Sequence, residues 1–153
     1  MQVYAGCWRK GDRKMRQDYE FAEFLVAAWR LANPGERLPT SHGLLDQALE
    51  RVSGDLPDRF RGYLTFFDGR TGRLCRELPA VLRSAQESFL TSEPNPTYLT
   101  AEVKIDSFLA HDLLDELGIT PDSADAFGKT LRQAIVGEIS SRAKSAREVA
   151  NAT

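Results

Sequence analysis

The chain has 153 residues, of which 27% are charged, and its formal net charge is −2 at pH 7. This length suits one domain with its own hydrophobic core, and the composition excludes both a disordered chain and a globally basic nucleic-acid-binding protein. The two cysteines are too few for a disulfide framework, and no apolar run is long enough for a signal peptide or a membrane span. We therefore expect a cytoplasmic protein with reduced thiols and no membrane contact.

The amino-terminal part combines a short alternating segment with a group of basic residues. Residues 1–7 alternate between apolar and polar positions, which is typical of a short strand. The residues that follow can contact phosphate groups and stack on a base: Trp8, Arg9, Lys10, Arg13 and Lys14. One hypothesis is a basic arm that binds nucleic acid, and the alternative is a charged beginning of the first helix.

Residues 18–32 predict a helix that is apolar on nearly every side and ends at Asn33-Pro34-Gly35. Phe21 and Trp29 lie on different sides of this helix, and both side chains need to be buried. A second wide apolar stripe runs through residues 127–139, so we expect more apolar helix surface than one small core hides. The sequence therefore predicts a homodimer with Phe21 and Trp29 at its interface.

Two further helices are predicted in the middle of the chain. Apolar residues between 44 and 52 repeat at helical spacing, and Thr40 or Ser41 can cap the helix that they form. Pro79 can open another helix that continues to Leu90, because proline at the first helical position loses no hydrogen bond.

Residues 56–78, between these helices, fit two structures. The segment 62–78 is typical of a β-hairpin, because Asp68-Gly69 and Gly72 suit a tight turn between two runs rich in aromatic and apolar residues. The apolar residues from 56 to 67 also fit one face of a helix. We favour the hairpin, because its aromatic and apolar residues are concentrated beside the turn.

Cys75, on the second strand of this hairpin, is the best candidate for a nucleophile. Arg73 and Arg76 flank it, and nearby positive charge lowers the pKa of a thiol. With Leu74 and Leu78 facing inward, the thiol would face the other side. The alternative is a passive, partly buried thiol.

Residues 97–105 alternate as a strand with one solvated face. Asp106 or Ser107 can cap a helix that ends at Gly118, and Pro121 can begin a second helix. The apolar residues of that second helix become sparse after Ile139, so we expect residues 143–153 to project from the body or to fray.

The order strand, helix, short turn, helix from Leu99 to Ile139 is similar to the ribbon-helix-helix pattern of small antitoxins and repressors. This resemblance implies a dimer in which two strands pair and lie in the major groove of DNA. The outward residues would be Thr100, Glu102 and Lys104, and Glu102 departs from the pattern because a carboxylate repels phosphate.

Acidic residues outnumber basic ones between Glu77 and Asp125. Five of these carboxylates could converge as general acid and base or as a Mg²⁺ site, and the alternative is a solvated face: Asp112, Asp115, Glu116, Asp122 and Asp125. The cysteines and histidines are not paired at the short spacing of a zinc site, and no nucleotide-binding motif is present. We expect neither a metal nor a cofactor.

These patterns predict an α+β fold, a mainly helical single domain over residues 1–153 with a β-hairpin and one or two short strands. The expected function is a non-enzymatic binding or regulatory module that acts through protein–protein contacts, with a second copy of the chain as partner. One alternative is a nucleic-acid-binding regulator that uses the basic arm or the ribbon-helix-helix-like part. The other is a small enzyme that uses Cys75 or the carboxylates.

Overall fold

The computed structural model describes residues 10–41, 43–70, 72–93 and 99–151. Within these ranges the chain is mainly helical and has two small two-stranded antiparallel sheets, which confirms the predicted α+β class. The strand predicted at residues 1–7 lies outside the described residues. No helix in the described part of the chain is long and apolar enough to cross a membrane.

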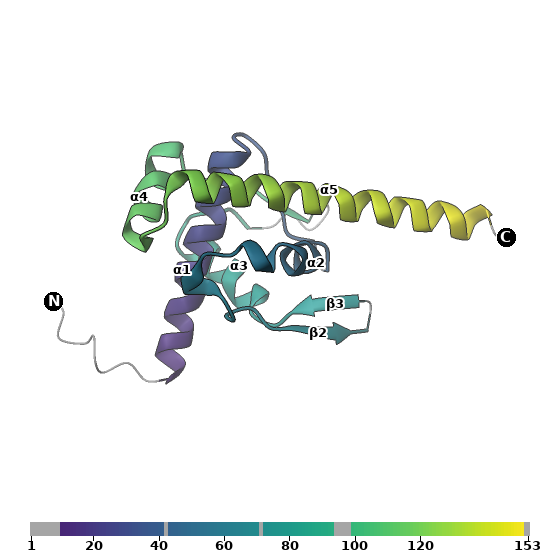
Figure 1. Ribbon diagram of the computed structural model, residues 1–153, viewed down its shortest axis with the longest axis horizontal. Helices are drawn as coiled ribbons and strands as arrows, with labels where there is room; N and C mark the ends of the chain where they lie inside the picture. The colour runs from purple at the N-terminus through teal and green to yellow at the C-terminus, as the bar shows by residue number, and fades with distance from the viewer. Residues whose placement is uncertain (1–9, 42, 71, 94–98, 152–153) are drawn as a thin grey trace.

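Helix α1 (Lys10–Ala32) forms the centre of the fold, and helices α3, α4 and α5 pack around it (Figure 1). From Phe21 to Trp29 every residue except Glu23 is buried, as the apolar sequence of this segment predicts. The helix extends further toward the amino terminus than the predicted start at Asp18. The added turns contain mostly good helix formers and need no buried face, because the residues from Arg13 to Gln17 are exposed.

The structure does not support an interface at Phe21 and Trp29. Their side chains are only 0% and 2% exposed in the single chain. Phe21 belongs to an aromatic cluster with Phe24 and Phe60, and the Trp29 indole N–H donates to the Glu36 carbonyl oxygen at 3.2 Å. A single chain already buries both side chains. Neither of them needs a second copy for its burial, which was the reason for placing them at an interface.

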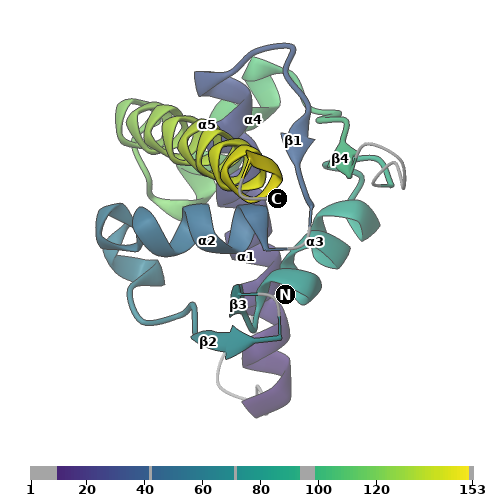
Figure 2. The same cartoon turned by 90° about the vertical axis from the view of Figure 1, so that its right-hand side faces the viewer.

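Helix α5 (Pro121–Asn151) crosses α1 and lies over α2 (Leu44–Arg51), as Figures 1 and 2 show from two sides. The two long helices approach each other closely at Gly128, where a Cβ atom would lie 2.4 Å from the carbonyl oxygen of Ala28. Only a glycine therefore allows this crossing. Against α2, the buried Glu138 carboxylate pairs with Arg51 at 2.7 Å.

The hairpin predicted within residues 62–78 is confirmed: β2 (Phe66–Gly69) pairs with β3 (Gly72–Cys75). Two short 3-10 turns, Ser53–Asp55 and Asp58–Phe60, lead from α2 to this hairpin.

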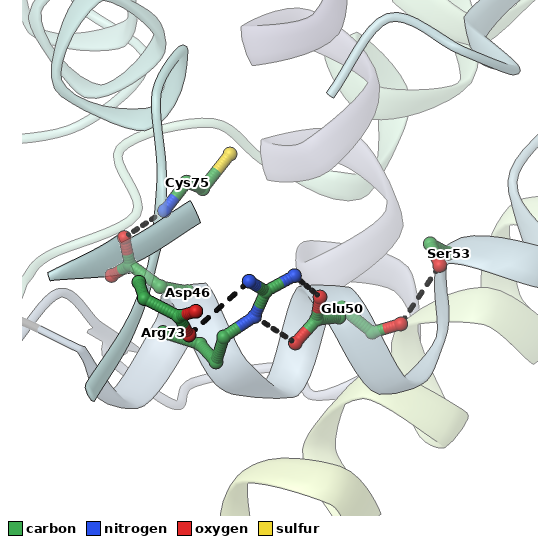
Figure 3. Close-up of polar contacts among 6 residues, drawn as sticks. Asp46, Glu50, Ser53, Arg73 and Cys75 are labelled. Atoms are coloured by element: carbon green, nitrogen blue, oxygen red, sulfur yellow. Dashed lines mark hydrogen bonds and ion pairs between the residues drawn. The ribbon is translucent and has the colours of Figure 1, made fainter. Parts of the chain in front are cut away.

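A buried carboxylate, Asp46, attaches the hairpin to α2. It accepts a hydrogen bond from the backbone N–H of Gly43 at 3.0 Å and another from that of Cys75 at 2.7 Å; Figure 3 shows the second. Because Asp46 is buried, the two donors satisfy a group that would otherwise be costly to remove from water.

Residues 97 and 98 of the strand predicted at 97–105 lie outside the described residues, and from residue 99 onward the observed strand is short and pairs within the chain. β4 (Thr100–Ala101) pairs with β1 (Leu38–Pro39), and Val103 forms an isolated bridge with Thr91. A ribbon-helix-helix protein instead pairs this strand with the same strand of a second copy. The ribbon-helix-helix interpretation is therefore wrong for this fold, because β4 has its partner in the same chain.

Helices α3 (Leu78–Glu87) and α4 (Ser107–Leu117) are both present, but α3 ends at Glu87 and does not continue to Leu90, because Phe89 has a positive φ of 61°. Pro79 lies in the first turn of α3. The Asp106 carboxylate caps α4 by accepting from the Leu109 N–H at 2.8 Å, and Gly118 ends it with φ of 72°. These helices complete one hydrophobic core that is shared by α1, α2 and the inner part of α5.

Candidate functional site

A pocket of about 700 Å³ opens beside the amino-terminal part of α1. Four cationic side chains from two distant segments converge around it, and we call this site the basic pocket. Its lining residues are Arg13, Lys14, Gln17, Arg59, Arg61, Gly62, Tyr63 and Glu77.

The four cations of the basic pocket are held to different degrees. Arg59 is fixed, because it donates to the Leu117 carbonyl oxygen at 2.6 Å and pairs with the Glu20 carboxylate. Arg61 contacts Asp58 at 3.2 Å on the exposed surface. Arg13 and Lys14 have no ion-pair partner among the described residues.

The polar groups beneath these cations are already engaged. The Tyr63 hydroxyl donates to the buried Asp18 carboxylate, and burial together with this hydrogen bond raises the pKa of Tyr63 above its ordinary value. Glu77 is also buried and accepts a hydrogen bond from the Thr65 N–H at 2.6 Å. The groups left to bind a ligand are therefore mainly the cationic donors at the rim.

Only part of the basic arm predicted from the sequence falls in this pocket. Arg13 and Lys14 lie there, Lys10 begins α1 but its side chain is not described, and Trp8 and Arg9 lie outside the described residues. The sequence shows the charge of Arg59 and Arg61 but no pattern that places them beside α1.

Cys75 does not have the environment of a nucleophile. Its side chain is 3% exposed, and burial is the main cause that raises its pKa to about 12. Arg73, which was expected to lower that pKa, instead binds Glu50 at 2.7 Å and Asp68 at 3.3 Å (Figure 3). The predicted orientation of this strand is wrong, because Cys75 faces the core while Leu74 is only partly buried. The alternative interpretation, a passive buried thiol, agrees with the structure.

The candidate carboxylates do not converge. Asp125 pairs with Lys129 at 2.8 Å, and Asp122 is exposed in the first turn of α5. In the described part of the chain, no group of three or more His, Cys, Asp or Glu side chains is arranged to hold a metal ion.

The remaining three carboxylates, Asp112, Asp115 and Glu116, lie exposed on α4. At 100° per residue they share one face with two exposed apolar side chains, Phe108 at 76% and Leu109 at 41% exposure. None of the three carboxylates has an ion-pair partner among the described residues. We call this surface the acidic face of α4.

The final part of α5, up to Asn151, extends away from the body (Figure 1). Every residue from 139 to 151 is exposed, and we call this segment outer α5. With Val136 just before it, it presents an apolar stripe at heptad spacing: Val136, Ile139, Ala143, Ala146 and Ala150.

The charge of outer α5 is opposite to that of the acidic face of α4. It has three basic side chains, Arg142, Lys144 and Arg147, and one acidic side chain, Glu148. At 100° per residue, Arg142 and Arg147 lie on either side of the apolar stripe. An exposed, basic, amphipathic helix and an exposed, acidic helix face are thus present in the same chain.

No protein-family model, curated protein or solved structure matches this chain. The basic pocket, the acidic face of α4 and outer α5 are therefore the grounds for a functional proposal.

Proposed function

We propose that this chain is a protein-interaction module in which outer α5 of one copy binds the acidic face of α4 on a second copy. The observation that carries this proposal is that every residue of outer α5 is exposed. Most helical stability in proteins comes from packing, and outer α5 continues a packed helix into a region where this contribution is missing. A partner that covers the apolar stripe supplies the missing packing.

The charges favour the acidic face of α4 as the surface that provides this cover. Two outer α5 segments placed against each other bring Arg142 and Arg147 of the two copies together, and like charges at a helix interface are unfavourable. Against α4 the same arginines meet Asp112, Asp115 and Glu116. Phe108 supplies a large apolar side chain for the stripe.

The shape of the molecule allows two such contacts at once. α4 and outer α5 lie at opposite ends of the molecule (Figure 1), and a helix of 31 residues is about 46 Å long. Two copies placed antiparallel along α5 can therefore each reach the other's α4. This arrangement has two-fold symmetry and closes on itself, so association stops at the dimer.

A charge exchange tests the proposal. We expect Arg142→Glu/Arg147→Glu to prevent self-association, and Asp112→Arg/Asp115→Arg to do the same, because each variant sets like charges against each other. A mixture of the two variants should dimerise, since acidic outer α5 of one then meets basic α4 of the other. Sedimentation equilibrium gives the molecular mass of all three samples over a range of protein concentrations, at low and high salt.

Arg70→Glu/Lys104→Glu is the matched control for the Arg142/Arg147 variant, because it changes the net charge by the same amount at exposed residues that belong to neither surface. This variant should dimerise as the wild type does. A wild type that is monomeric at all concentrations would contradict the proposal, and so would a mixture of the exchanged variants that remains monomeric.

A further inference from the structure

We infer that the basic pocket is a binding site for a small molecule with a phosphate monoester group. This site is separate from outer α5 and the acidic face of α4, and its observations are independent of the proposed self-association. Arg13 and Lys14 come from α1, whereas Arg59 and Arg61 come from the segment after α2. Folding thus gathers four like charges around one concavity, which is unfavourable unless counter-charges offset them.

The chain offsets only part of this positive charge. Glu20 neutralises Arg59, and Asp58 lies beside Arg61. Arg13 and Lys14 have no such partner among the described residues, so these two cations can pair with a ligand at the rim, above the buried carboxylates of Asp18 and Glu77. A phosphate monoester has a charge of about −1.5 to −2 near neutral pH, which matches them.

The donors also suit phosphate oxygens. An arginine guanidinium offers a planar pair of N–H donors that can bind two oxygens of one phosphate, and the Lys14 ammonium adds a compact charge. The phosphate lies at the rim between Arg13, Lys14 and Arg61, away from the buried carboxylates of Asp18 and Glu77. Those carboxylates already accept hydrogen bonds from Tyr63 and Thr65.

The size of the pocket favours a small organic phosphate over a nucleic-acid strand. Sites for small molecules commonly occupy about 300 to 1,000 Å³, and the basic pocket has about 700 Å³. A phosphate alone fills a small part of this space. The rest of the ligand lies against Gln17, Gly62 and Tyr63.

Calorimetric titration of the full chain at low salt tests this inference with three probes. These are inorganic phosphate, adenosine monophosphate as an organic monoester, and a single-stranded oligonucleotide. We expect the monoester to bind, and its affinity to fall at least tenfold in Arg13→Ala/Lys14→Ala and in Arg61→Ala. Arg13, Lys14 and Arg61 are exposed, so circular dichroism should show an unchanged fold in each variant.

Arg70→Ala/Lys104→Ala removes two exposed positive charges elsewhere and should leave the affinity unchanged. Tighter binding of the monoester than of inorganic phosphate identifies an organic ester as ligand, and equal binding identifies the phosphate group alone. The inference is overturned if neither the monoester nor inorganic phosphate binds, or if the pocket variants bind the monoester as the wild type does. It is also overturned if the oligonucleotide binds much more tightly than the monoester. The last result would assign Arg13 and Lys14 to a nucleic-acid surface.

Discussion

The inner and outer parts of α5 belong to one uninterrupted helix but are stabilised in different ways. The inner part packs Phe127, Leu131 and Ile135 into the core against α1 and α2. Every residue of outer α5 is exposed, and this segment relies on the helix propensity of its alanine, arginine and lysine residues. The comparison shows that a continuous helix can contain one segment fixed by tertiary packing and another whose stability depends on a partner.

The largest effect is expected where the inner part meets α1. In Gly128→Ala, the new Cβ would lie 2.4 Å from the Ala28 carbonyl oxygen, a backbone atom that cannot move alone. The two helices must separate, and overpacking of this kind costs about 1–3 kcal/mol. Urea denaturation should show this loss in the free energy of unfolding.

Gly137→Ala is the matched control in the same helix, because a Cβ there has no atom within 4 Å. Alanine has the higher helix propensity, so this variant should be more stable than the wild type by up to about 1 kcal/mol. Two substitutions of the same kind should thus act in opposite directions. Equal effects would show that the close crossing at Gly128 does not exist.

An intermediate effect is expected from the buried thiol in the packed body. Burial raises the pKa of Cys75 to about 12, so the folded chain keeps this proton at pH values where the unfolded chain has lost it. Stability should therefore fall as the pH rises from about 9 toward 12. Urea midpoints at several alkaline pH values should fall less steeply in Cys75→Ala.

The stability of Cys75→Ala should still fall as the pH rises, because the pKa of Tyr63 is also raised in the folded chain and this too lowers stability at alkaline pH. The slopes with pH are the quantities to compare, since the truncation itself lowers stability at every pH. Identical slopes in the two proteins would contradict the predicted protonation of Cys75 in the folded state.

The smallest effect on global unfolding is expected in outer α5. Ala143→Gly/Ala146→Gly disfavours the local helix by about 1 kcal/mol per residue, but these side chains are exposed and contribute nothing to the core. At monomer concentrations the urea midpoint should not change. Amide hydrogen exchange should become faster only in outer α5, and a lower urea midpoint would contradict the contrast between the two parts.

Local signals in the sequence predict much of the fold. Asp106 and Gly118 mark the two ends of α4 because one caps by accepting a backbone hydrogen bond and the other adopts a positive φ. The turn residues Asp68 and Gly69 identify the hairpin. These structures depend on residues that are close in sequence, so a pattern can reveal them.

Properties that depend on distant residues could not be predicted. The sequence shows that Phe21 and Trp29 need cover but does not show that Phe60 and other core residues already provide it. Arg59 joins Arg13 in one pocket only because the segment after α2 returns to α1. The sequence does not reveal that β4 pairs with β1, because β1 has only two residues.

Because α5 crosses α1 closely at Gly128, a small change in the crossing angle there moves the far end of α5 like the end of a lever. Asn151 lies 23 residues beyond this glycine (151 − 128), a distance of about 35 Å along the helix axis. A change of about 10° in the angle between α1 and α5, well within the range seen among packed helices, would move the end of the lever by about 6 Å. The position that a partner meets at outer α5 is therefore set by the packing of one residue without a side chain, far from the surface that the partner touches.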